Sequence, residues 1–296
     1  MKRAAFLVTA ITVFAAACGG EKALPGAGDG QQQSARSGKR ITIKGSDTMV
    51  ILGQRFAEEY MKAYPGTVVQ VTGGGSGTGV AALINGTVDL AQSSRPMKDK
   101  EKADVQARTG VPVVEMPVAI DALAVFLHGQ NPVAELSLDQ LKQIYQGKVT
   151  NWKDLGGKDA PIVLYGRENS SGTYEYFKEH VLAKEDYSPR VQTLQGTAAV
   201  VNAVAKDPNG IGYGGIAYES SVKLAAVKKD AGTPAVAPSE QTAMDGTYPI
   251  SRQLYFYYPE SAPENVKAFA AWAVSDGGQA VVKNVGYFPL PVAKEQ

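Results

Sequence analysis

The sequence predicts an α/β protein with a parallel sheet at its core. Short β-branched segments alternate with amphipathic helical ones, and a polar or glycine-rich loop separates a strand from the helix after it. The 296 residues exceed one average domain and fit two lobes. A composition of 44% hydrophobic and 20% charged residues is typical of a globular protein with a sizeable core.

The first part of the folded chain shows this alternation clearly. Apolar residues recur at every third or fourth position from Met49 to Tyr64, and the Pro65-Gly66 pair ends this helix. The β-branched run TVVQVT predicts a strand that leads into the glycine-rich loop GGGSGTG. The predicted elements are, in order, a strand at 40–44, a helix at 49–64, a strand at 67–72, a helix at 80–85 and a strand at 88–91.

The rest of the chain repeats the same elements around two long β-type stretches. The first stretch, 113–128, is broken at Pro117, and the second, RQLYFYY at 252–258, is rich in aromatic residues. The other predicted elements are helices at 138–145, 174–182, 197–205 and 266–274, strands at 162–165 and 211–218, a loop at Trp152, and an irregular loop at 227–247.

The N-terminus predicts an export signal. Lys2 and Arg3 precede an apolar run of about a dozen residues, which is too short to cross a bilayer, so 1–17 is typical of a signal peptide. Cys18, the single cysteine, follows three alanines and resembles the lipidated cysteine of a bacterial lipobox, although Ala15 stands where such motifs usually carry leucine. The alternative is ordinary cleavage that leaves a free thiol. The Gly-, Gln- and Ser-rich segment 18–39 predicts a flexible tether.

Composition excludes several classes of function. A formal charge of +1 gives no basic field for nucleic acid or an anionic membrane. One cysteine excludes a disulfide framework, and His128 and His180 are too few for a histidine metal centre. No GxxxxGK[ST] or GxSxG motif occurs, and the glycines at 77 and 79 fit a dinucleotide fingerprint poorly. We therefore expect a binding protein without metal, cofactor or catalysis.

Three predicted loops lie where a strand leads into a helix: 45–48, 73–79 and 167–173. The N-terminus of a helix has about four unpaired N–H groups and roughly half a positive charge, which together attract anions. Ser, Thr and Gly in all three loops, with Arg167 in the third, favour an oxyanion site. The alternative for each loop is that the hydroxyls only cap the helix.

At these loops the sequence resembles the PstS family of phosphate-binding proteins of bacterial ABC transporters. The resemblance rests on the segments ITIKGSDTM, VTGGGSGTGVAALINGTVDLAQSSRPM, IYQGKVTNW, RENSSGTYEYF, NGIGYGGIAY and GTYPISRQLYFY. It implies a type 2 periplasmic binding-protein clamshell, with hinge crossings near 117–121 and 246–251 and a central ligand cleft. The implied lobes are 40–117 plus 250–296, and 118–249.

The resemblance also implies the residues that bind the anion. The family's ligand loops match the following positions here: Ser46, Thr48, Ser76, Gly77, Ser94, Arg95, Arg167, Ser171, Gly172 and Thr173. Arg167 would be the main charge partner, because a guanidinium binds oxyanions through two parallel hydrogen bonds.

This sequence departs from the family pattern at one position, which concerns the selection of phosphate over sulfate. Some family members carry an aspartate where this chain has Ser94, and that carboxylate accepts the proton of monohydrogen phosphate. We hypothesise that Asp47 supplies the acceptor here; the alternative is that Asp47 caps the following helix. Arg95 is expected either to contact the phosphate or to pair with Asp47.

The sequence thus predicts a monomeric, lipid-anchored protein of the periplasm or cell surface that captures inorganic phosphate and delivers it to an ABC-type permease. The alternatives are a receptor for sulfate, molybdate or tungstate, a phosphate sensor or surface protein, and a phosphate-ester hydrolase. The absence of a histidine beside the candidate serines argues against the hydrolase.

Overall fold

The computed structural model describes residues 40–291. The predicted signal peptide at 1–17, the lipidated Cys18 and the tether at 18–39 lie outside the described residues.

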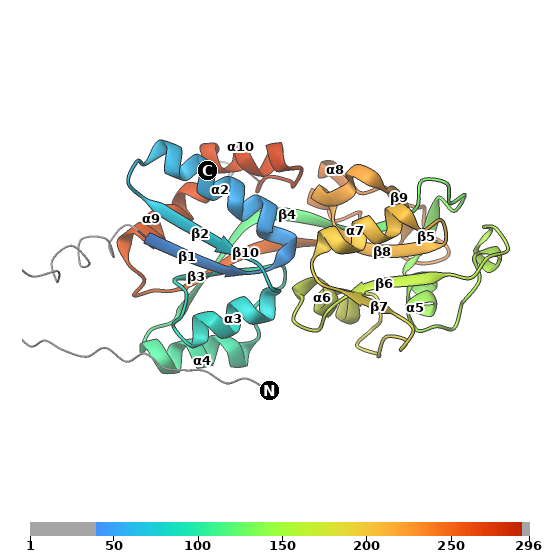
Figure 1. Ribbon diagram of the computed structural model, residues 1–296, viewed down its shortest axis with the longest axis horizontal. Coiled ribbons are helices and arrows are strands. Elements are labelled where there is room, and N and C mark those ends of the chain that lie inside the picture. Colours follow the sequence, from blue (N-terminus) through green and yellow to red (C-terminus); the bar gives the residue numbers. More distant parts are fainter. Residues whose placement is uncertain (1–39, 292–296) are drawn as a thin grey trace, which may run out of the picture. The chain divides into compact units, whose positions relative to one another are not determined.

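The first group of elements, here called the first lobe, is built on three parallel strands. Strands β1 (Arg40–Gly45), β2 (Val68–Thr72) and β3 (Leu90–Ser93) pair with β1 in the middle, which confirms the predicted parallel core. In Figure 1, α2, α9 and α10 lie on one side of these strands, and α3 and α4 lie on the other. The helices are α2 (Val50–Ala63), α3 (Ser76–Ile84), α4 (Asp99–Thr109), α9 (Glu264–Ala273) and α10 (Asp276–Val285).

Two long strands continue from this lobe into the rest of the chain (Figure 1). Strand β10 (Ser251–Pro259) pairs antiparallel with β3 and with the first part of β4 (Val113–Leu127). From Leu123 onward β4 pairs instead with β8 and β9. The two β-type stretches of the sequence are therefore the strands that join the two groups of elements.

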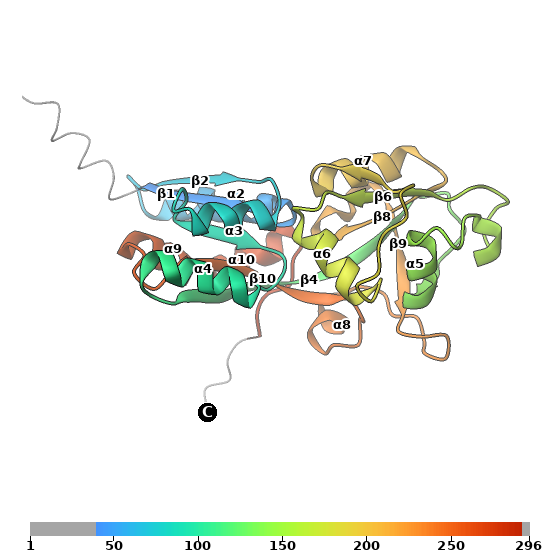
Figure 2. The same ribbon diagram turned by 90° about the horizontal axis from the view of Figure 1, so that it is seen from below.

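The second group of elements, here called the second lobe, follows the same alternation. Strand β6 pairs in parallel with β7 and β8, and Figure 2 shows α6 and α7 on opposite sides of these strands. Its elements are β5 (Glu135–Ser137), α5 (Leu138–Tyr145), β6 (Val163–Arg167), α6 (Gly172–His180), β7 (Gln192–Leu194), α7 (Thr197–Lys206), β8 (Gly210–Gly215), β9 (Lys223–Lys228) and α8 (Glu240–Met244).

Each lobe has an aromatic centre in its core. In the first lobe Phe56 packs edge-on against Phe256 and Trp272 with ring centroids 6.0 Å apart. In the second lobe Phe177 stacks on Tyr213 at 4.0 Å. Each such ring, once buried, contributes roughly 1.5–3 kcal/mol. The lobes can therefore hold their loops in place on rigid supports.

The structure also contains elements that the sequence patterns did not predict. Helix α4 has one buried residue, Val105, so its sequence DKEKADVQART shows no apolar period. Helix α10 begins with the glycine pair of SDGGQ, which predicts a turn rather than a helix. Strand β9 and the short helix α8 overlap the segment 227–247, so the prediction of an irregular loop there is wrong in part.

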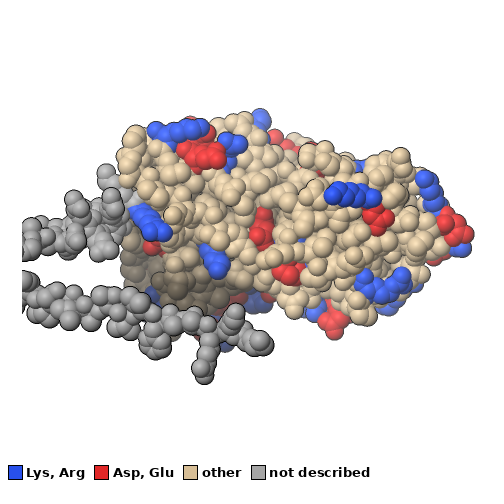
Figure 3. All heavy atoms as spheres, viewed as in Figure 1, with Lys and Arg blue, Asp and Glu red and all other residues tan. Residues whose placement is uncertain are grey.

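The described surface carries charges of both signs. On the face shown in Figure 3, Lys and Arg side chains are interspersed with Asp and Glu, and they form no continuous basic patch there. Within residues 40–291, no helix is both long and apolar enough to cross a membrane.

Candidate functional site

The three strand-to-helix loops of the two lobes meet where β4 and β10 join them. Thr48 and Ser76 come from the first lobe, in the turn after β1 and at the first position of α3. Thr173 comes from the first turn of α6 in the second lobe. The Oγ1 atoms of Thr48 and Thr173 are 2.8 Å apart, so side chains from the two lobes are in direct contact.

A cluster of four buried hydroxyls forms the centre of this contact: Thr48, Ser76, Ser94 and Thr173. Ser76 Oγ lies 3.4 Å from Ser94 Oγ and accepts the backbone N–H of Ser94 at 3.1 Å. Gly172 faces this pair so closely that a Cβ on it would lie 2.3 Å from Ser76 Oγ. Hydroxyls concentrated at the junction of two lobes can offer hydrogen bonds to a polar ligand, which makes this junction a candidate binding site.

Arg167 supplies a positive charge beside this hydroxyl cluster. Its side chain is buried at the end of β6, with 2% of the residue exposed. The guanidinium donates from Nη1 to Thr197 Oγ1, from Nε and Nη2 to the Glu168 carboxylate, and from Nη2 to Asp47 Oδ2, all at 2.9–3.0 Å. Burial by itself raises the pKa of Glu168, but the hydrogen bonds and charge of Arg167 outweigh it and hold that pKa below its usual value.

Asp47 links the two lobes through Arg167. Its Oδ2 accepts from Arg167, and its Oδ1 accepts the backbone N–H of Gly74 at 2.8 Å. Tyr218 of the second lobe also donates to the Asp47 carbonyl at 2.9 Å. The carboxylate makes no cap bond to its helix, so the alternative that Asp47 is a helix cap is wrong. An ionised carboxylate offers about four acceptor positions, so Asp47 can accept further hydrogen bonds.

Comparisons with known proteins identify relatives that match most of the chain. The family model of the PBP superfamily domain matches residues 30–277. The phosphate-binding protein PstS of Pseudomonas aeruginosa is 39% identical over 96% of this chain and 94% of its own length. PstS of Bacillus subtilis is 32% identical over 96% of this chain and 92% of its own length.

Solved structures show the same relationship. A phosphate ABC transporter substrate-binding protein from Clostridium perfringens, crystallised with bound phosphate, superposes with a TM-score of 0.78 at 30% identity, over 85% of this chain and 99% of its own. The chain belongs to the PstS family. Its fold is accordingly the two-lobed fold of periplasmic binding proteins, as the sequence predicts.

Two other predicted positions in this PstS-family chain, Ser171 and Ser46, are hydrogen-bonded within their own lobes. Ser171 is the N-cap of α6, and its Oγ accepts the N–H groups of Thr173 and Tyr174 at 3.2 and 3.3 Å. Ser171 therefore caps this helix in the structure. Ser46 is buried, and its backbone N–H and C=O both bond to Gln92 of β3.

Gly77 connects the glycine-rich loop to the second lobe. Its backbone N–H donates to the carbonyl of Ser170 at 2.9 Å, and Ser170 Oγ donates to the carbonyl of Gly74 at 3.2 Å. The glycine-rich loop of this chain thus lies directly against the loop that carries Arg167.

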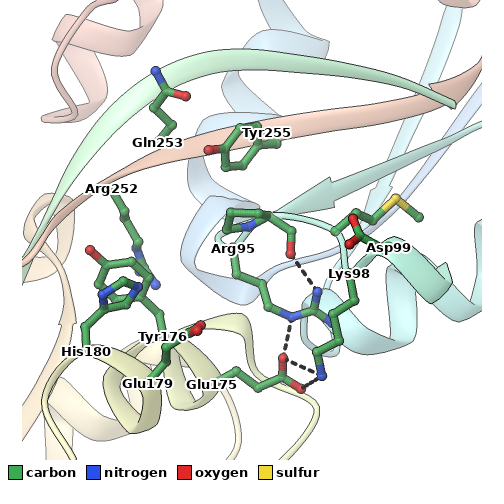
Figure 4. Close-up of a pocket in the computed structure, with 12 residues that line it drawn as sticks. Arg95, Lys98, Asp99, Glu175, Tyr176, Glu179, His180, Arg252, Gln253 and Tyr255 are labelled. Carbon is green, nitrogen blue, oxygen red and sulfur yellow. Dashed lines mark hydrogen bonds and ion pairs between the residues drawn. The ribbon is translucent and has the colours of Figure 1, made fainter. Parts of the chain in front are cut away.

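Arg95 does not pair with Asp47, which was one of its two predicted roles. Its guanidinium forms two hydrogen bonds of 2.8 Å to Glu101 and a third to the Pro96 carbonyl. Figure 4 shows its ion pair to Glu175 of the second lobe, which is 2.6 Å long. Burial lowers the pKa of Arg95, but the two glutamates outweigh it and raise that pKa above its usual value. The prediction that Arg95 pairs with Asp47 is wrong, because Arg95 pairs with Glu101 and Glu175 while Asp47 pairs with Arg167.

Three side chains of the site were not predicted from the sequence: Thr197, Asp121 and Arg252. Thr197 begins α7 and receives the Arg167 bond. Asp121 of β4 and Arg252 of β10 form a buried ion pair of 2.9 Å on the two strands that join the lobes. The sequence carried one signal for this pair, since Asp121 interrupts the apolar run VAIDALAVFL of a strand that is otherwise buried.

The described residues also bear on metal binding. Between residues 40 and 291, no group of three or more His, Cys, Asp or Glu side chains is arranged to hold a metal ion. The positive charge available to an anion at these loops comes from arginine side chains.

Proposed function

We propose that this protein binds inorganic phosphate between its two lobes and delivers it to an ABC-type permease. The observation that carries the proposal is the buried hydroxyl cluster at the meeting point of the lobes, beside the buried guanidinium of Arg167, in a chain of the PstS family. Charge-assisted hydrogen bonds contribute about 1.5–3 kcal/mol each, so a few of them suffice for micromolar affinity or better.

The proposed ligand residues are those that the family's loops imply, with Arg95 removed from direct contact. Phosphate would be held by the hydroxyls of Thr48, Ser76, Ser94 and Thr173, by Arg167, and by backbone N–H groups near Ser46, Gly77, Ser171 and Gly172. Binding would shift an equilibrium between separated and apposed lobes toward the apposed form, and no covalent bond would form or break. The proposed lobes are 40–117 plus 250–296, and 118–249; the change of strand partner along β4 supports a crossing near this boundary.

The same proposal covers location and partners. We infer an extracytoplasmic protein that is anchored through a lipid on Cys18 and acts as a monomer, without catalysis. The signal-like sequence at 1–17 supports export. The mixed charges on the face in Figure 3 support the view that nucleic acid is not a ligand.

The direct test is a calorimetric titration of phosphate into the purified, ligand-stripped protein, with sulfate, molybdate and tungstate titrated under the same conditions. We expect phosphate to bind at least tenfold more tightly than the other three anions. Equal or tighter binding of sulfate or molybdate would mean that the protein's ligand is another tetrahedral oxyanion and not phosphate. Hydrolysis of a generic phosphomonoester, with or without divalent metal, would contradict the proposal that the protein is not an enzyme.

Asp47 is proposed to select phosphate, because its carboxylate can accept the proton that phosphate carries at neutral pH and sulfate lacks. Asp47→Asn removes the negative charge that repels a fully deprotonated anion. We expect the ratio of sulfate Kd to phosphate Kd to fall about tenfold, which corresponds to about 1.4 kcal/mol. Calorimetry with both anions measures the ratio, and the exposed Asp139→Asn serves as the matched control. An unchanged ratio in Asp47→Asn would exclude this role.

A further inference from the structure

Arg252 and Asp121 face each other on the two strands that join the lobes. They are direct partners in the antiparallel register of β10 and β4. Arg252 Nε and Nη2 both donate to Asp121 Oδ2, at 3.0 and 2.9 Å, while Asp121 Oδ1 accepts the backbone N–H of Ile216 at 3.0 Å. Asp121 is 0% exposed and Arg252 6% exposed, so the ion pair is fixed from both sides within the core.

An aromatic ring holds the other side of this guanidinium. Arg252 Cζ lies 5.2 Å from the ring centroid of Tyr176, and the two side chains lie next to each other in Figure 4. The Tyr176 hydroxyl donates to the carbonyl of Ser251 at 2.7 Å, which fixes the ring against β10. These contacts orient the guanidinium through Nε and Nη2, while its Nη1 has no hydrogen-bond partner among the described residues.

In that orientation Arg252 reaches the hydroxyl cluster. Its Nη2 donates to Thr173 Oγ1 at 2.9 Å, and Thr173 Oγ1 is in turn 2.8 Å from Thr48 Oγ1. A guanidinium can only donate, so Thr173 must accept from Arg252 and must give its own proton to another group. If the Thr48 hydroxyl donates to Thr173, the Thr173 hydroxyl is free to donate to a third group. If the Thr173 hydroxyl donates to Thr48, the Thr48 hydroxyl is free to do so instead.

In both cases the threonine pair keeps one O–H free to donate to a third group, and Arg252 occupies an acceptor position of Thr173. We propose that Arg252 is a positioning residue for the anion: held by Asp121, it orients the Thr173–Thr48 hydroxyls as donors without itself contacting the ligand. This role rests on the proposed phosphate function. It also connects the ligand loops to the strands β4 and β10, because the positioning residue lies on one of them and its counter-ion on the other.

The test is a double-mutant cycle on the full protein with phosphate as the titrant. Arg252→Gln and Thr173→Val are each expected to raise the phosphate Kd about tenfold, the effect of one lost charge-assisted hydrogen bond. The double variant is expected to bind within about twofold of Thr173→Val alone, because Arg252 acts only through that hydroxyl. In Thr173→Ser, which keeps a hydroxyl, Arg252→Gln should again weaken binding about tenfold.

Two results would overturn the role. Wild-type affinity in Arg252→Gln would mean that Arg252 does not influence binding, and additive losses in the double variant would mean that it acts on the anion directly. Arg252→Gln leaves Asp121 buried without its counter-ion, so the neutral pair Asp121→Asn with Arg252→Gln is tested in parallel to preserve folding. Failure of both variants to fold would also reject the role, since it would make the pair purely structural.

The exposed Arg190→Gln is the control and should leave the phosphate Kd unchanged. The wild-type titration separates the two proposals. If the wild type does not bind phosphate, the proposed function fails; if it binds and the cycle is additive, only the positioning role fails.

Discussion

Arg167→Ala is expected to raise the phosphate Kd by about 100-fold, since the variant loses the buried positive charge and at least one charge-assisted hydrogen bond of about 1.5–3 kcal/mol. The structure adds a second cause. Asp47 and Glu168 both pair with this guanidinium, so its removal leaves two carboxylates facing the anion with no counter-charge between them. The loss should therefore exceed that of a hydroxyl in the same cluster. Calorimetry with phosphate measures it.

Two further variants make this result specific. Arg167→Lys keeps the charge but not the planar donor fork, so an intermediate Kd is expected. The exposed Arg190→Ala should bind as the wild type does. Because Arg167 is also buried and bonded to Thr197, a thermal melt of each variant in the absence of phosphate is needed to show that it is folded. Near-native phosphate affinity in a folded Arg167→Ala protein would show that Arg167 does not contribute to phosphate binding.

The fold could be predicted from the sequence where each element buries one face. The β-branched run of β2 and the apolar period of α2 reflect their contacts with the core, so both appeared in the sequence. Helix α4 could not be predicted from the sequence, because it buries only Val105. Polar contacts stabilise it, among them the hydrogen bond of 2.8 Å from the Lys98 N–H to Glu101. A pattern of hydrophobicity cannot show an element that buries so little.

The residues of the candidate site could be predicted from the composition of its loops. The pairing of its charged side chains could not. Hydroxyls and Arg167 in the strand-to-helix loops could be selected as ligand residues, because a helix N-terminus favours anions. Which carboxylate pairs with which arginine depends on how the lobes meet. Arg95 pairs with Glu101 and Glu175, Arg167 with Asp47 and Glu168, and only the tertiary structure decides between these partners.

Gly172→Ala is expected to raise the phosphate Kd about 10- to 100-fold while leaving the unliganded protein as stable as the wild type. A Cβ at this position would lie 2.3 Å from Ser76 Oγ and 2.8 Å from Ser94 Oγ, both on the other lobe. Overpacking of this kind costs about 1–3 kcal/mol. The cost arises only where α6 approaches the first lobe, so it opposes the apposed form that holds the ligand.

The backbone of Gly172 itself gives no reason for instability. Gly172 begins α6 without a positive φ, and alanine is a better helix former than glycine. The melting temperature without phosphate should therefore stay the same or rise, whereas the stabilisation on adding phosphate should largely disappear. Gly129→Ala is the matched control, because a Cβ there meets no atom within 4 Å. Native phosphate affinity in Gly172→Ala would mean that phosphate binding does not require this close approach of the two lobes.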